Sequence, residues 1–172
     1  MTNAIALKSH GNAGITGCVK NLGIGSTPAA VYSASTTGTD CTRNYTTSGV
    51  SSYIDHSFAG LGAFVSDFYS VKPPDFAIFD GLQGMQNGPC SLNLAADLKN
   101  MRLILASKNA VALDTVESAI MTCAGSKIPY LTQLESWGLG TTDMSKITVV
   151  GNKQVDDVKQ SFAGIGDGTV CN

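Results

Sequence analysis

Two lysines and a histidine lie close together near the start of the chain, in a segment rich in glycine. Lys8 and His10 precede Lys20, and glycines occupy positions 11, 14, 17, 23 and 25. His10 could act as an acid, a base or a metal ligand, because imidazole titrates near neutral pH. Lys20 could anchor an anionic substrate or cofactor, and glycines let the backbone approach a ligand closely. We therefore expect an anion, cofactor or metal site in residues 8–25, with redox or proton-transfer chemistry and with His10 and Lys20 as catalytic residues.

Other residues near this segment are expected to bind the ligand. A short helix over residues 16–22, with Thr16 as its N-cap and Gly23 as its C-terminal stop, would direct free backbone N–H groups at an anion. Asp80 ends a predicted strand, and ligands of open α/β sheets bind beyond the carboxyl ends of strands. The identities of the cofactor and of any metal stay open. The expected ligand-binding residues are Lys8, Thr16, Asn21, Gly23, Gly25 and Asp80.

Each of these residues also has a structural interpretation. Lys8 could be a solvated residue at a strand end, and Asp80 before Gly81 could be a turn residue. His56, the second histidine, lies off the apolar stripe of a predicted helix. Asp114 lies inside a helix beside apolar residues, so its carboxylate needs a partner that could be purely structural.

The elements that must position these residues alternate between strands and helices. This order predicts one α/β domain over residues 1–172, with a mixed or mainly parallel sheet and helices packed on it. If the strands are parallel, Ser107 and Lys108 at the end of the third strand gather with the other polar residues. A long loop (26–48) and a second glycine-containing loop (81–96) separate the elements. Strands are expected at 4–9, 75–79, 102–106 and 147–150, and helices at 16–22, 50–68, 110–123, 128–137 and 155–162.

Composition excludes several classes of protein. Of the 172 residues, 43% are apolar and 14% are charged, and the formal net charge is −2. A nucleic-acid-binding protein would need a clustered basic face. The apolar runs are far shorter than the roughly 20 residues that span a bilayer, and the N-terminus lacks the features of a signal peptide. We expect a cytoplasmic protein that binds neither nucleic acid nor membrane, and an oligomer is compatible with the sequence.

The cysteines do not form a recognisable metal motif. None of the five lies within four residues of another. This spacing excludes ferredoxin-type iron–sulfur motifs and zinc ribbons, although ligands that meet only in space stay open. The odd number and wide spacing favour free thiols in a reducing compartment. The cysteines are Cys18, Cys41, Cys90, Cys123 and Cys171.

Three segments resemble the bacterial and archaeal domain of unknown function 362 family. They are KSHGNAGITGCVKNLGIG (8–25), DFAIFDGLQGMQNGPC (75–90) and RLILASKNAVALDTVES (102–118), and the predicted strand ending in VVG (149–151) also fits. The resemblance implies an α/β fold. Many members carry a ferredoxin module, which this sequence lacks. Relatives usually have a further α/β region before the Lys-His signature, so the resemblance implies either a compact variant or a fragment of a longer family domain.

A looser likeness is to the N-terminal domain of lactate racemases. In those enzymes a histidine and a lysine with the spacing of His10 and Lys20 hold a nickel-bearing cofactor derived from nicotinic acid. The sequence before Lys20 is ITGCV, which differs from the run of glycines in that family. This likeness indicates only where a site would lie.

Three functions fit these residues. The first is an enzyme of redox or proton-transfer type, in which His10 is the acid, base or ligand and Lys20 holds an anionic group. The second is a non-catalytic module that binds a small anion or a metal through the same residues. The third is a structural or partner-binding fragment of a longer protein.

Overall fold

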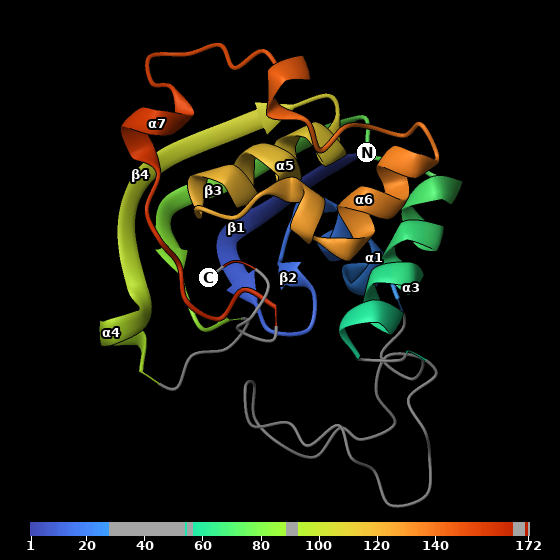
Figure 1. The fold of residues 1–172 in the computed structure, drawn as a ribbon, viewed down its shortest axis with the longest axis horizontal. Helices are drawn as coiled ribbons and strands as arrows, with labels where there is room; N and C mark the ends of the chain where they lie inside the picture. The colour runs from blue at the N-terminus through green and yellow to red at the C-terminus, as the bar shows by residue number, and fades with distance from the viewer. Residues whose placement is uncertain (28–53, 55–56, 89–92, 167–170, 172) are drawn as a thin grey trace, which may run out of the picture.

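The computed structural model describes residues 1–27, 54, 57–88, 93–166 and 171 (Figure 1). Several sequence predictions lie outside these residues. They are most of the loop predicted over 26–48, most of residues 50–56 of the second predicted helix, His56, Cys41 and Cys90.

The strands form one mixed four-stranded sheet in the order β2-β1-β3-β4. β1 (Thr2–His10) and β3 (Phe76–Met85) are parallel, whereas β2 (Gly14–Ile15) and β4 (Leu98–Ser107) each run antiparallel to their neighbour. The predicted α/β fold with a mixed sheet is therefore confirmed. The first three predicted strands are present and longer than expected. Residues 147–150 are not a strand, because their backbone makes no sheet pairing.

The larger helices pack on one side of this sheet. Figure 1 shows α5 (Ala110–Ile120) lying along the sheet, with α1 (Cys18–Gly25), α3 (Phe58–Val71) and α6 (Pro129–Ser136) grouped at the β1 side. Capping side chains fix two of the helix starts: Ser57 accepts the Gly60 amide of α3, and Asn109 accepts the Ala112 amide of α5. Short helices α4 (Leu94–Asp97) and α7 (Val155–Val158) complete the set. The helices predicted at 110–123 and 155–162 are present but end earlier.

The sheet buries one face and exposes the other. Leu7 and Phe79 point into the helix side and are at most 1% exposed. Residues at alternate positions point the other way, as the two-residue period of a strand requires. Leu82 is 60% exposed and Ile104 is 74% exposed. We call this second side the open face of the sheet.

Residues 160–166 run back across the carboxyl end of β1. The Ala163 carbonyl accepts hydrogen bonds from the Ser9 hydroxyl (2.9 Å) and the Asn87 amide (3.0 Å), and the Gly166 amide donates to the His10 carbonyl (3.2 Å). These contacts fix the segment 160–166 beside the end of β1.

Cys123 and Cys171 form a disulfide, 48 residues apart in sequence. The prediction of free thiols is wrong for this pair, because the chain returns to α5 after a long excursion that spacing alone does not reveal. The support that free thiols gave to a reducing compartment is thereby lost. Cys18 is a free and buried thiol. Among the described helices, none has the length and apolar character needed to cross a membrane.

Candidate functional site

The N-terminus of α1 is occupied by a carboxylate of the protein itself. Asp114 of α5 accepts hydrogen bonds from the backbone amides of Cys18 (2.7 Å) and Val19 (3.0 Å) and from the hydroxyl of Tyr130 (3.3 Å). The predicted anion contact to free N–H groups of this helix is therefore wrong, because α5 supplies the anion. Thr16 is not the N-cap either: Gly17 is, and its lack of a side chain leaves room for the carboxylate.

Asp114 and its neighbour Glu117 form a buried acidic pair. Burial raises the pKa of Asp114 to about 7, against the lowering effect of its three hydrogen bonds. Glu117 lies one turn further along α5 and is 0% exposed, and neither of its carboxyl oxygens has a hydrogen-bond partner in the part of the chain that the structure describes. Burial and the nearby Asp114 raise the pKa of Glu117 well above its usual range. Both effects favour the protonated, uncharged form of Glu117.

Sequence reasoning missed Glu117. The available signal was its position three residues after Asp114, on the same face of a helix whose other buried residues include Val111 and Ile120. A glutamate on such a face is rarely buried without a partner. The hydroxyl of Thr16 is also buried without a hydrogen-bond partner among the described residues.

Lys8 and Lys20 are neighbouring cations at the junction of β1 and α1. Lys20 is 7% exposed; burial lowers its pKa to about 8, and the charge of Lys8 lowers it further. Burial also lowers the pKa of Lys8, while Glu117 opposes that shift. In the described part of the chain, neither lysine takes part in a salt bridge. Two cations thus share a poorly solvated region without an acidic partner at ion-pair distance.

His10 lies at the end of β1 and is 6% exposed. Its Nδ1 accepts a hydrogen bond from the Asn12 amide at 3.0 Å. In the neutral imidazole the proton is therefore on Nε2, since an accepting nitrogen carries none. Any exchange of a proton with a ligand would take place at Nε2.

Two of the predicted ligand-binding residues attach α1 to its surroundings. The Asn21 side-chain amide donates to Asn3 of β1 (2.6 Å), and Gly23 faces Val65 of α3, where a Cβ would lie 3.2 Å from a methyl group. Gly23 does not stop the helix, which continues to Gly25. The cavity described next is lined by none of Asn21, Gly23 and Gly25.

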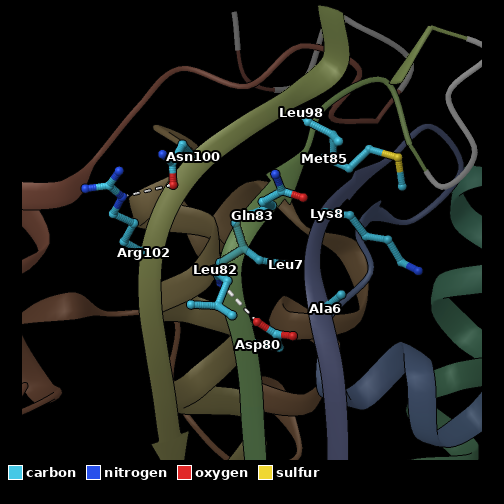
Figure 2. Close-up of a pocket in the computed structure, with 10 residues that line it drawn as sticks. All are labelled: Ala6, Leu7, Lys8, Asp80, Leu82, Gln83, Met85, Leu98, Asn100 and Arg102. Atoms are coloured by element: carbon cyan, nitrogen blue, oxygen red, sulfur yellow. Dashed lines mark hydrogen bonds between the residues drawn. The ribbon is translucent and has the colours of Figure 1, made fainter. Parts of the chain in front are cut away.

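A cavity of about 700 Å³ opens on the open face of the sheet (Figure 2). Lys8 and Asp80 both line it, so the structure brings these two predicted residues together. Asp80 was predicted to end its strand, and this is wrong: it lies in the middle of β3, opposite Ala6 of β1. We call this cavity the sheet-face hollow. Its lining residues are Ala6, Leu7, Lys8, Asp80, Leu82, Gln83, Met85, Leu98, Asn100 and Arg102.

Irregular strand pairing shapes the sheet-face hollow. The register between β1 and β3 shifts between Ala6 and Lys8, and the register between β3 and β4 shifts between Gly81 and Gln83. Arg102 on β4 has a φ of 55°, in the left-handed region that non-glycine residues rarely adopt. Bulges of this kind bend a strand and redirect its side chains, and they are common beside functional sites.

Ser107 and Lys108 do not join this group. Because β4 runs antiparallel to β3, Ser107 pairs with Ala77 near the start of β3. The expectation that polar residues from all three strand ends gather at one edge is therefore wrong for the third strand.

The fold defines a single α/β domain built on a mixed sheet. A profile of the family Domain of unknown function (DUF362) matches residues 1–119, which is more than half of the chain. The chain belongs to this family. No curated protein and no solved structure matches it, and the likeness to lactate racemases is not confirmed.

Proposed function

We propose that this domain binds a small anionic molecule at Lys8 and Lys20, where β1 meets α1. The observation that carries the proposal is the proximity of two partly desolvated lysines without a carboxylate at ion-pair distance in the described residues. Such an arrangement costs free energy, because burial and a like charge both disfavour the ammonium form. An anionic ligand would offset this cost. Within the described residues, Glu117 forms no salt bridge with either lysine.

The sheet-face hollow supports this location. Lys8 lines it, so a bound anion would have access from solvent. His10 follows two residues later, and its Nε2 could donate a proton to the ligand. The hydroxyl of Thr16 offers a further polar group, one that has no hydrogen-bond partner among the described residues.

A catalytic role is the second candidate, and the pKa of Lys20 favours it. An amine whose pKa is about 8 is partly neutral under mildly basic conditions. Such an amine can accept a proton or attack a carbonyl carbon, as lysines in poorly solvated sites do. Turnover of a carbonyl compound or proton exchange, lost in Lys20→Ala, would distinguish this candidate from binding alone.

The binding proposal is tested by calorimetric titration of the whole chain with inorganic phosphate, pyrophosphate and sulfate. We expect pyrophosphate to bind, and Lys8→Ala and Lys20→Ala each to weaken binding by at least about tenfold. Lys127→Ala is the matched control, because Lys127 is exposed and lies in a different part of the chain. Undiminished affinity in both site variants would overturn the proposal. So would the absence of binding by all three anions up to about 10 mM.

A further inference from the structure

We propose that the sheet-face hollow holds the organic body of the ligand, so that the natural ligand is a carboxylate or phosphate ester with a flat, largely apolar body. This inference rests on the proposed function for the anionic end of the ligand. It adds the substrate class, which the two lysines alone do not define.

The size of the hollow is the first argument. Its volume of about 700 Å³ far exceeds that of an inorganic ion. Cavities of roughly 300–1,000 Å³ are typical of sites for organic molecules. An inorganic anion beside Lys8 would leave most of this space to water.

The lining of the hollow is the second argument. Ala6, Leu82, Met85 and Leu98 provide an apolar floor, and two of these side chains are unusually exposed: Leu82 at 60% and Leu98 at 38%. Apolar side chains on a concave surface with a few polar groups are typical of ligand sites. A flat apolar body lying on this floor would remove their surfaces from water, which is favourable by about 25 cal/mol per Å².

The polar groups are arranged around that floor. Figure 2 shows the ammonium of Lys8 at the outer edge of β1, Arg102 at the far side on β4 and Asp80 between them on β3. The Asp80 carboxylate accepts the Leu82 amide through one oxygen (3.0 Å). Its other oxygen makes no hydrogen bond within the described residues, so it can accept one from a hydroxyl or amino group on the ligand. The anionic end then lies toward Lys8 and Lys20, and the body extends across Leu82 toward Arg102.

The backbone around this hollow departs from regular strand geometry. The left-handed conformation of Arg102 is unfavourable for a residue other than glycine, and conformations of this kind cluster at ligand sites. Arg102 is held there by a bulge, since Gly81 pairs with Leu103 while Gln83 pairs with Asn100. The bulge and the shift between Ala6 and Lys8 lie at the same level of the sheet. A regular sheet would present a flatter surface.

The test compares phenyl phosphate with inorganic phosphate in calorimetric titrations of the whole chain. We expect phenyl phosphate to bind at least about tenfold more tightly to the wild-type protein. Ala6→Phe places a ring in the hollow and should abolish this gain, so that phenyl phosphate and inorganic phosphate bind the variant with similar affinities. Ala4→Phe is the matched control, because Ala4 is also exposed on the open face but does not line the hollow.

The outcomes separate this inference from the proposed function. Equal affinities for the two probes in the wild-type protein, or a gain that survives Ala6→Phe, would overturn the inference while phosphate binding through Lys8 and Lys20 still stands. A wild-type dimer that Ala6→Phe disrupts without any ligand would also overturn it, since a second copy would then cover the hollow. The proposed function would be refuted instead if the wild-type protein bound no phosphate, or if neither Lys8→Ala nor Lys20→Ala weakened phosphate binding.

Discussion

Asp114 approaches Gly17 so closely that a Cβ on residue 17 would lie 2.1 Å from its Oδ2 atom and 2.7 Å from the Tyr130 hydroxyl. The carboxylate reaches this position to accept the amides of Cys18 and Val19. The start of α1 is thereby joined to the middle of α5. Lys20 follows within the same turn of α1, so this contact also determines where one of the two site lysines lies.

We expect Gly17→Ala to lower the free energy of unfolding by about 3 kcal/mol or more, because the added methyl group must displace a buried, hydrogen-bonded carboxylate. Urea unfolding monitored by circular dichroism measures the change. Gly151→Ala is the control: a Cβ at Gly151 meets no atom within 4 Å, so its effect should stay within about 0.5 kcal/mol. Similar stabilities of the two variants would contradict the geometry at Gly17.

Stability should fall as the pH rises from about 5 to about 7. Asp114 and Glu117 have raised pKa values in the folded state. The unfolded chain releases these protons first, so the folded state binds more protons in this window, and stability decreases toward higher pH. Each group can lower the free energy of unfolding by up to about 1.4 kcal/mol for each unit by which the pH rises.

Glu117→Met isolates the contribution of one carboxyl group. Methionine fills a similar volume without an unpartnered polar atom, so the variant should be more stable at pH 7 by about 1–3 kcal/mol. It should also show a weaker dependence on pH between about 5 and 7. Urea unfolding at several pH values tests both expectations. A wild-type stability that rises over this window, or an equal slope in the variant, would show that Glu117 is ionised in the folded protein.

Binding of pyrophosphate should take up a proton under mildly basic conditions. Lys20 has a pKa of about 8 in the free protein, and a bound anion favours its ammonium form. Affinity should therefore fall as the pH rises above about 8. Calorimetry in two buffers of different ionisation enthalpy measures the proton uptake directly. In Lys20→Arg the uptake should disappear, because a guanidinium stays charged throughout this range. Uptake that persists in this variant would assign the proton to another group.

Removal of the Cys123–Cys171 disulfide should loosen the segment 160–166. Cys171→Ser should lower the free energy of unfolding by up to about 4 kcal/mol, from the chain entropy of a closed loop of this length. The Asn87 and Gly166 amides, which this segment holds in hydrogen bonds, should exchange with deuterium faster. Cys123→Ser should have the same effect, and the double variant should lose no further stability. Additive losses in the double variant would mean that the two cysteines stabilise the fold independently.

Local patterns predicted most of the elements. The apolar strands at 4–9, 75–79 and 102–106 and the helix periodicity after Ala110 are signals within short windows, and all are present. Asp80 was misplaced because Asp-Gly normally ends a strand, whereas here an irregular register lets β3 continue to Met85. The direction of β4 was not predictable, since the sequence of a strand does not state which way it runs.

The candidate site depended on contacts that no local pattern contains. Thr16 has the chemistry of an N-cap, yet Asp114 takes that role from 95 or more residues away along the chain. Lys8 and Lys20 were identified because both lie in one short segment. Glu117 was missed because its burial depends on the packing of α5 against the sheet and α1. The sheet-face hollow was missed because it depends on the register shifts between β1 and β3 and between β3 and β4.

The hydrogen bonds from 160–166 to the end of β1 have a consequence for how the chain folds. β1 is synthesised before the other described elements, but the Ser9 hydroxyl and the His10 carbonyl acquire partners from residues made more than 150 positions later. Its parallel neighbour β3 is also distant in sequence. Contacts between residues so far apart slow folding, because a long loop must close before they form. The strand that carries Lys8 and His10 therefore leaves the ribosome before the other described strands and is among the last to be completed, and for that interval its end lacks these hydrogen-bond partners.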